Sequence, residues 1–324
     1  MRTADVCRRS TEKEKMRIRI GSRQSPLAKW QAHHVAAALE RIGCEVEFVW
    51  LVTEGDRSTG PLAEAGGVGV FTKAIQRALL EGRCDAAVHS LKDLPTQPVP
   101  GLRLAATPPR EDPRDCLVSN RFASLDALPL GASVGTGSPR RVAQLLRLRP
   151  DLQVRSIRGN VDTRLRKLRE GEYDAIMLAA AGLRRLELAD HITEYLEPTR
   201  MLPAVGQAAL GLECRSDDDA TAQTLGQLND LATWHAVAAE RAVLRDLQAG
   251  CLAPMGVHAA WRGGELHLSA RLLSPDGRRC LQTSSACKLP LAESADADLP
   301  IREGEHLGIL AAMQLRLAGA EALL

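Results

Sequence analysis

The sequence predicts an α/β protein in which two doubly wound lobes enclose a cleft and a smaller α+β third domain follows. Residues 17–52 show the pattern of strand, loop, helix and strand, and residues 132–158 repeat it. After residue 256, short alternating segments separated by glycine-containing turns are typical of an antiparallel sheet. A chain of 324 residues is long enough for two or three such units.

The first unit begins with a strand over residues 17–21 and continues with a helix from Pro26 to Leu39. Proline suits a first helical turn because the N–H it lacks would have no partner there, and Ser25 can cap the helix. A second strand follows over residues 45–52. The N-terminus of this helix therefore faces the loop that joins it to the first strand.

The second unit has a strand over residues 133–135, a helix from Pro139 through Leu148 and a strand over residues 153–157. Prolines are frequent between residues 95 and 113 and mark the boundary between the lobes. Residues 210–214 form a strand that can return to the first lobe. A helix is predicted from Asp230 to Ala249 with Gly250 as its C-cap, and its apolar face comprises Leu231, Trp234, Val237, Ala238, Leu244 and Leu247. Strands over residues 256–261, 266–273 and 280–288 and a final helix from Glu305 follow. We predict these units: an N-terminal tail over 1–16, a first lobe over 17–108 with 209–228, a second lobe over 109–208, and a third domain over 229–324.

Composition excludes several classes of function. Aromatic residues are only 3%, too few for platforms that stack nucleic-acid bases, and a net charge of +2 argues against a general polyanion or membrane-surface binder. No apolar stretch is long enough to span a membrane, and the first sixteen residues lack the apolar core of a secretory signal. The eight cysteines show no zinc spacing, so we expect no metal and a reducing, cytoplasmic location.

Arginines gather where predicted strands end and helices begin. A guanidinium is a planar fork that holds a carboxylate through two hydrogen bonds, and helix N-termini add N–H donors. Several such forks around one cleft would suit a small substrate with many carboxylates, although each arginine alone can equally be a solvated surface residue. The arginines in question are Arg23, Arg140, Arg141, Arg155, Arg158 and Arg164.

Two further residues have both a functional and an ordinary interpretation. Asp93 is predicted to end a buried strand that starts near Asp85, so its carboxylate should lie beside Lys92 at the cleft mouth. It can also be a turn-forming aspartate before Pro95. Cys251 follows the C-terminus of a helix that is predicted to end at residue 249. The helix dipole raises the pKa of a thiol at a helix C-terminus. Cys251 is therefore either a buried thiol or a nucleophile used without activation.

Seven motifs follow one another along the chain: Gly21–Ala28, Ala87–Pro95, Arg110–Asp115, Val134–Arg141, Arg158–Leu165, Leu202–Gln207 and Gly250–Pro254. In this order they resemble those of the hydroxymethylbilane synthase (porphobilinogen deaminase) family. The resemblance is close from about residue 17 to about residue 256 and looser through the third domain, and it leaves the first sixteen residues outside.

The resemblance implies an enzyme of tetrapyrrole biosynthesis, the route to haem and chlorophyll. It would join four porphobilinogen molecules head to tail, release ammonia at each step and free a linear hydroxymethylbilane. The cofactor would be a dipyrromethane bound to Cys251 by a thioether. The implied fold has two lobes like those of periplasmic binding proteins, and the chain would act as a monomer.

The resemblance also implies roles for individual residues. Asp93 would be catalytic, with Lys92, because a fixed carboxylate stabilises positive charge on a pyrrole nitrogen and can carry a proton. The cofactor-binding residues would be Cys251, Lys92, Asp93, Ser138, Arg140, Arg141 and Arg164. The substrate contacts would be Arg23, Ser25, Arg158, Arg185 and Gln207.

The chain departs from the family pattern in a few places. Glu64 and Val68 stand where the family usually has lysines, and Ala208 stands where it usually has glycine. Two alternatives follow: a low-activity or inactive paralogue that binds pyrroles or carboxylates, and a two-lobed binding protein without turnover. The retained Lys92, Asp93 and Cys251 favour the enzyme over both.

Overall fold

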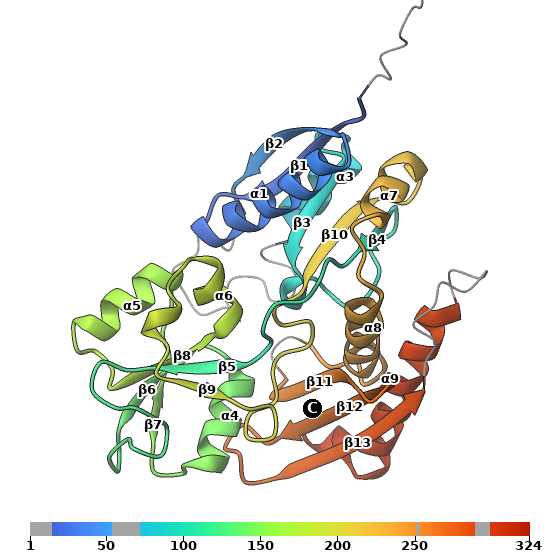
Figure 1. The fold of residues 1–324 in the computed structure, drawn as a ribbon. Helices are drawn as coiled ribbons and strands as arrows, with labels where there is room; N and C mark the ends of the chain where they lie inside the picture. Colours follow the sequence, from blue (N-terminus) through green and yellow to red (C-terminus); the bar gives the residue numbers. More distant parts are fainter. Residues whose placement is uncertain (1–14, 54–71, 251–252, 289–298) are drawn as a thin grey trace, which may run out of the picture.

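The computed structural model describes residues 15–53, 72–250, 253–288 and 299–324, with the backbone alone over 299–303. Three β-sheets, each covered by helices, build two lobes and a third domain (Figure 1). The fold class predicted from the sequence is confirmed. The exact limits of the domains stay predictions.

The first lobe has a five-stranded sheet in the order β2-β1-β3-β10-β4. β1 runs parallel to β2 and β3, whereas β10 lies antiparallel between β3 and β4, so the expected return of the chain to this lobe is confirmed. Ile18, Ile20, Val35 and Leu39 are buried between the sheet and its first helix. The elements are β1 (Arg17–Arg23), α1 (Pro26–Arg41), β2 (Glu45–Leu51), α3 (Lys73–Leu80), β3 (Ala86–Ser90), β4 (Leu102–Ala106), β10 (Leu210–Arg215) and α7 (Asp219–Gly226).

The second lobe repeats this plan with the strand order β7-β6-β8-β5-β9. β6 runs parallel to β7 and β8, and β5 lies antiparallel between β8 and β9. Two segments cross between the lobes: residues 107–114 lead from β4 to β5, and residues 197–209 lead from β9 to β10. In each lobe the antiparallel strand therefore directly follows a crossing segment. The elements are β5 (Asp115–Val118), β6 (Ser133–Gly135), α4 (Pro139–Leu148), β7 (Gln153–Arg155), α5 (Val161–Arg169), β8 (Ala175–Ala179), α6 (Ala180–Arg185), the 3-10 helix η2 (Ala189–His191) and β9 (Glu194–Leu196).

The third domain is an antiparallel sheet whose one face is covered by two helices (Figure 1). Val257, Leu268 and Leu272 of the sheet pack against Val243 and Leu315 of the helices. The elements are α8 (Leu231–Asp246), β11 (Met255–Arg262), β12 (Glu265–Leu273), β13 (Cys280–Lys288), α9 (Leu299–Leu317) and the 3-10 helix η3 (Ala320–Ala322).

Two helices of this domain differ from the prediction. α8 ends at Asp246 rather than near residue 249, and Gln248, with φ of 52°, leaves the helical region where Gly250 was expected to cap it. The predicted apolar face is also displaced, because α8 buries Thr233, His235 and Glu240 along with its small residues. Polar side chains can be buried when tertiary partners satisfy them, and the sequence pattern does not display those partners. The last helix begins at Leu299, earlier than Glu305.

Among the helices of the described ranges, none combines the length and apolarity that a membrane span requires.

Candidate active site

Lys92 and Asp93 lie in a one-turn 3-10 helix, η1 (Leu91–Asp93), that directly follows β3. The strand itself ends at Ser90, so Asp93 stands one turn beyond the strand end predicted for it. The Leu94 N–H closes the turn by donating to the Leu91 carbonyl at 3.1 Å, and the Leu91 N–H donates to the Ala209 carbonyl at 3.0 Å. We call η1 the catalytic turn, because it carries the two residues that the sequence resemblance implies to be catalytic.

The side chain of Leu91 anchors the catalytic turn in the first lobe. It is 1% exposed and lies against two glycines of the returning chain. A Cβ on Gly211 would come within 2.9 Å of the Leu91 side chain, and one on Gly206 within 3.1 Å. Gly206 also has φ of +66°, a conformation that glycine adopts without strain. The two glycines let the backbone approach Leu91 closely and so fix the turn that carries Asp93.

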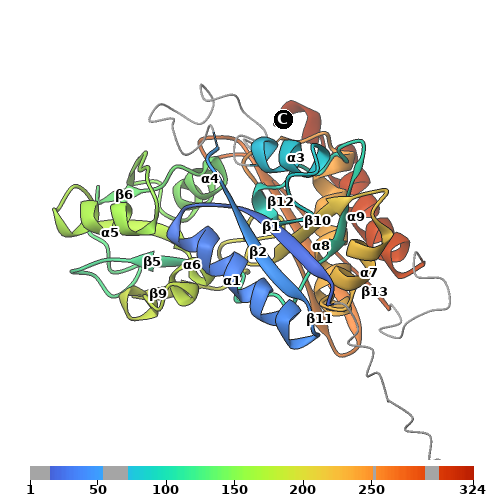
Figure 2. The same ribbon diagram turned by 90° about the horizontal axis from the view of Figure 1, so that it is seen from above.

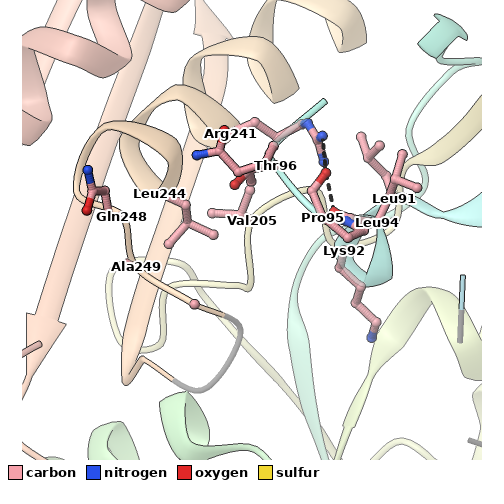
Figure 3. A pocket seen from close by; sticks show the side chains of 12 residues that line it. Leu91, Lys92, Leu94, Pro95, Thr96, Val205, Arg241, Leu244, Gln248 and Ala249 are labelled. Atoms are coloured by element: carbon pink, nitrogen blue, oxygen red, sulfur yellow. Dashed lines mark hydrogen bonds between the residues drawn. The ribbon is translucent and has the colours of Figure 1, made fainter. Parts of the chain in front are cut away.

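Arg241 of α8 holds the other end of the catalytic turn. It donates to the carbonyls of Leu94 at 3.0 Å and Pro95 at 2.6 Å (Figure 3). A cavity of about 370 Å³ lies beside these contacts, bounded by the turn, by α8 and by Gly250. In Figure 3 the Lys92 side chain points away from Arg241. Cys251 itself, like Glu64 and Val68, lies outside the described residues.

A buried polar group lies behind the strand that leads to the turn. His89 Nε2 is 3.0 Å from Glu213 Oε2, and Gln76 Nε2 donates to Glu213 Oε1 at 3.0 Å. All three side chains are buried. Gln31 Nε2 donates to Ser90 Oγ at 2.8 Å, so α1 is tied to the same strand end. These contacts hold the end of β3, and hence the turn, by side chains as well as by the sheet.

Asp115, at the start of β5, is the centre of an ion-pair cluster in the second lobe. Arg140 Nη1 lies 2.5 Å from Oδ2, and Arg141 Nη2 and Gln207 Nε2 donate to Oδ1 at 2.8 and 3.0 Å. Burial alone would raise the pKa of Asp115, but Arg140 and Arg141 hold it well below its usual range. Three predicted site residues thus meet on one carboxylate that the sequence interpretation did not assign. Within the part of the chain that the structure describes, Arg140 Nε and Gln207 Oε1 are buried without a hydrogen-bond partner.

Lys92 faces this cluster from the first lobe. Its side chain is exposed at the surface, but the surrounding protein partly desolvates the ammonium group. This desolvation lowers the pKa of Lys92 to about 8. Arg141 and Arg140 also lower this pKa, whereas Asp93 and Asp115 oppose the shift. The catalytic turn and the Asp115 cluster are therefore close enough to interact electrostatically across the two lobes.

Two further predicted arginines extend the positive region. Arg164 Nε donates to the Gly159 carbonyl at 2.9 Å, and its pKa is lowered to about 10 by burial and by the neighbouring charges of Arg141 and Arg158. We define the cation cluster as Lys92, Arg140, Arg141, Arg158 and Arg164. Its charge exceeds that of the carboxylates of Asp93 and Asp115, which makes it suited to anionic groups.

The remaining predicted residues have separate positions. Arg185 ends α6, donates to the Ala208 carbonyl at 2.6 Å and lies over the Trp30 ring of α1 at 5.6 Å; burial lowers its pKa to about 10. Arg23 ends β1. Ser25 and Ser138 are the N-caps of α1 and α4, so each hydroxyl accepts a bond from its own helix.

Sequence reasoning missed a second buried ion pair, between Arg110 and Glu240. Arg110 donates to both carboxylate oxygens of Glu240, at 2.7 and 3.1 Å, and its Nε donates to the Gln207 carbonyl at 2.8 Å. Glu240 also accepts from the Gly206 and Ala259 N–H groups at 2.7 and 2.9 Å. The pair joins both segments that cross between the lobes to α8. The signals available were three charged residues at the predicted lobe boundary and a glutamate within an Ala-rich helix.

Two models of known protein families match this chain. The model of the dipyrromethane cofactor-binding domain of porphobilinogen deaminase matches residues 18–223, and the model of the porphobilinogen deaminase C-terminal domain matches residues 234–316. The chain belongs to the porphobilinogen deaminase family. The resemblance seen in the sequence is confirmed, hydroxymethylbilane synthase function is supported, and nothing favours the non-catalytic alternatives.

Several solved structures share part of the fold at low identity. The methionine-binding protein MetQ is 14% identical, with a TM-score of 0.44 over 65% of this chain and 89% of that one. A periplasmic substrate-binding protein of an ABC transporter from Coxiella burnetii is 16% identical, with a TM-score of 0.44 over 69% and 96%. A putative lipoprotein from Actinomyces odontolyticus is 15% identical, with a TM-score of 0.42 over 66% and 90%.

The residues around the catalytic turn fit the cofactor that the family binds. A dipyrromethane carries several carboxylates, and the cation cluster offers guanidinium and ammonium donors for them. Gln207 Oε1, which has no hydrogen-bond partner among the described residues, lies beside Asp115 and can accept a bond from an N–H group. The described part of the chain holds no group of three or more His, Cys, Asp or Glu side chains placed to bind a metal.

Proposed function

We propose that this chain makes hydroxymethylbilane with Asp93 as its catalytic carboxylate and Cys251 as the attachment point of its cofactor. The observation that supports the proposal most is the electrostatic interaction of Lys92, the neighbour of Asp93 in the catalytic turn, with Arg140, Arg141 and Asp115 of the second lobe. A polycarboxylate pyrrole requires cations for its acid side chains and, in this proposal, the Asp93 carboxylate for the charge that develops on its ring.

The reaction of each cycle forms one carbon–carbon bond. The aminomethyl carbon of porphobilinogen loses ammonia, bonds to the unsubstituted α-carbon of the terminal pyrrole, and that α-carbon then loses its proton. When bound, the dipyrromethane supplies the first of these terminal pyrroles. The Asp93 carboxylate stabilises the positive charge that spreads to the pyrrole nitrogen as ammonia leaves. It then accepts the proton from the α-carbon and passes it to solvent, which restores it for the next cycle.

Cations of both lobes bind the acetate and propionate side chains in this proposal. Lys92, with Asp93 beside it, lies on the first lobe, and the second lobe contributes arginine forks whose planar donors match a carboxylate. The cofactor-binding residues are Cys251, Lys92, Asp93, Ser138, Arg140, Arg141 and Arg164. The substrate-binding residues are Arg23, Ser25, Arg158, Arg185 and Gln207.

The link to Cys251 is a thioether. The sulfur forms a bond to the methylene carbon of a porphobilinogen unit while the carbon–nitrogen bond breaks, and the thiol proton leaves with ammonia. A thioether is neither hydrolysed nor reduced by thiols, so it survives repeated turnover. Gly250, the preceding residue, borders the cavity beside the catalytic turn, which supports this assignment.

The test is the intact mass of the protein expressed in a host that makes porphobilinogen. We expect a mass gain equal to two porphobilinogen units, each less one ammonia, and no gain in Cys251→Ala. Cys280→Ala is the control, because Cys280 is a partly buried thiol of the same predicted domain, and this variant should keep the adduct. An unmodified parent chain, or an adduct that survives in Cys251→Ala, would refute the proposal.

The working form is proposed to be a cytoplasmic monomer. Cys44, Cys84, Cys116 and Cys214 are buried as thiols, which suits a reducing compartment. Sedimentation of the loaded protein at micromolar concentration should give one species with the mass of a single chain. A dimer under these conditions would contradict the monomer.

A further inference from the structure

The third domain touches the helix that carries Arg140 and Arg141. Both arginines lie in the first turn of α4, and the later turns of this helix meet the hairpin that joins β12 to β13 (Figures 1 and 2). Gly277 lies at the tip of this hairpin with φ of +72°. A Cβ there would collide with the Ala143 carbonyl and lie 2.8 Å from the Arg147 nitrogen. The hairpin backbone therefore packs directly on the α4 backbone, with no space for a methyl group.

Arg271 of β12 reaches across the same boundary. Its Nη1 donates to Gln144 Oε1 at 3.2 Å and to the Arg200 carbonyl at 3.1 Å, and its Nη2 donates to the Thr199 carbonyl at 3.2 Å. One side chain of the third domain thus holds both α4 and the segment that follows β9.

Gln144 continues the contact toward the site. It donates to the Leu202 carbonyl at 2.9 Å, and the Leu202 N–H donates back to Gln144 Oε1 at 2.9 Å. The same Leu202 carbonyl accepts a bond from Arg140 Nη1 at 2.6 Å. Gly256 of β11 packs so closely on Leu202 that a Cβ would lie 2.6 Å from the Leu202 Cβ. The third domain therefore reaches Arg140 through three hydrogen-bonded steps, from Arg271 to Gln144, from Gln144 to Leu202 and from Leu202 to Arg140.

The last step ends on Asp115. Arg140 Nη1 bonds both the Leu202 carbonyl and Asp115 Oδ2, and Asp115 in turn fixes Arg141 and Gln207. These groups are buried, so water does not readily replace a lost partner. A displacement of Leu202 or of α4 must therefore move the guanidinium groups of Arg140 and Arg141.

We propose that Arg271 and the hairpin tip at Gly277 are positioning residues that set the place of Arg140 and Arg141 in the active site. The third domain then has two tasks, since it carries Cys251 and also fixes the arginines that the cofactor meets. The inference rests on the proposed function, in which Arg140 and Arg141 bind the cofactor.

The test compares kcat and KM for porphobilinogen in loaded Arg271→Met and Arg271→Lys proteins. Methionine keeps an apolar stem but donates no hydrogen bond, and a misplaced reacting ring should lower kcat roughly 10-fold while KM stays within about a factor of two. Lysine retains a donor, so Arg271→Lys should recover kcat to within about 3-fold of the parent. A general loss of stability would lower the active fraction of both variants without the recovery by lysine.

Gly277→Ala and Gly264→Ala form a matched pair at the two hairpin turns of the domain. Both glycines have positive φ, but a Cβ on Gly264 meets nothing within 4 Å. We expect Gly277→Ala to lower kcat as Arg271→Met does, and Gly264→Ala to keep the parental kcat despite a similar backbone cost. If Gly277→Ala does not fold, the Arg271 pair decides alone.

A kcat of Arg271→Met equal to that of the parent, or a change confined to KM, would overturn the inference. If the parent chain is at the same time loaded with cofactor and active, the proposed function stands. A parent chain without adduct or turnover would instead refute the proposed function. The two failures are therefore distinguishable in one set of measurements.

Discussion

Replacement of Glu240 by glutamine should strongly lower the free energy of unfolding of this protein, although glutamine has nearly the same size and shape as glutamate. Glu240 is fully buried and Arg110 is 9% exposed, so the variant leaves a guanidinium in the interior without its counter-ion. Removing one partner of such a pair costs about 3–5 kcal/mol. The lowered pKa of Glu240 gives a similar figure: a change from 4.5 to about 2 corresponds to about 3 kcal/mol.

The assay is urea unfolding followed by tryptophan fluorescence, since Trp261 lies on β11 next to this region. Glu305→Gln is the matched control. Glu305 of α9 forms an ion pair at 2.9 Å with Arg245, which lies on α8 as Glu240 does. The Glu305 side chain is 29% exposed, and such pairs contribute at most about 1 kcal/mol. Equal losses of unfolding free energy in the two variants, both below about 1 kcal/mol, would show that the buried pair does not fasten α8 to the crossing segments.

The sign of the pH dependence follows from the same pair. The folded-state pKa of Glu240 is lowered, so its contribution to stability is complete above its ordinary value of 4.5 and disappears as the pH falls toward about 2. The parent should therefore lose unfolding free energy faster than Glu240→Gln between these pH values. A parallel decline in both proteins would contradict the assignment.

Three further predictions concern the site. Asp93→Asn should keep the adduct by intact mass but lower kcat by at least about 100-fold, since general acid–base and electrostatic roles are of that size; near-normal turnover would remove Asp93 from catalysis. Lys92 has its pKa lowered to about 8, so kcat/KM should fall as the pH rises through that value, and Lys92→Arg should move the fall to higher pH; an unmoved alkaline limb would exclude Lys92 as its cause. Ala208 has φ of 72°, which glycine adopts at lower cost, so Ala208→Gly should raise the unfolding free energy by about 0.5–1 kcal/mol, measured as a higher Tm; a lower Tm would refute the strain.

Local signals in the sequence were sufficient for much of the fold. Ser25 and Ser138 cap their helices as expected for Ser-Pro at a helix start, because a cap involves residues only three positions apart. The strands of the third domain agree with the predicted segments to within a few residues, since alternation is read from neighbours. α8 was less well predicted, because its buried face depends on α9 and on Arg110, which are distant in sequence.

The site was predicted through its ordered motifs rather than through composition or spacing, which left Asp93 and Cys251 with ordinary alternatives. The motifs identified the family and the residues of the catalytic turn. They did not identify Asp115 as the carboxylate on which Arg140, Arg141 and Gln207 converge. Each of these pairings is separated by many residues, so only the packing of β5, α4 and the crossing segment brings them together.

The sequence by itself determined the fold class, the family and the chemical types available in the cleft, because periodicity, helix caps and motifs are properties of neighbouring residues. The tertiary structure alone decided which charges meet. It placed Lys92 near the Asp115 cluster, buried Glu240 on Arg110, and connected Arg271 to Arg140 through Gln144 and Leu202. Electrostatic and hydrogen-bond partners are chosen by distance in space, and burial sets their strength, so neither can be read from the order of residues alone.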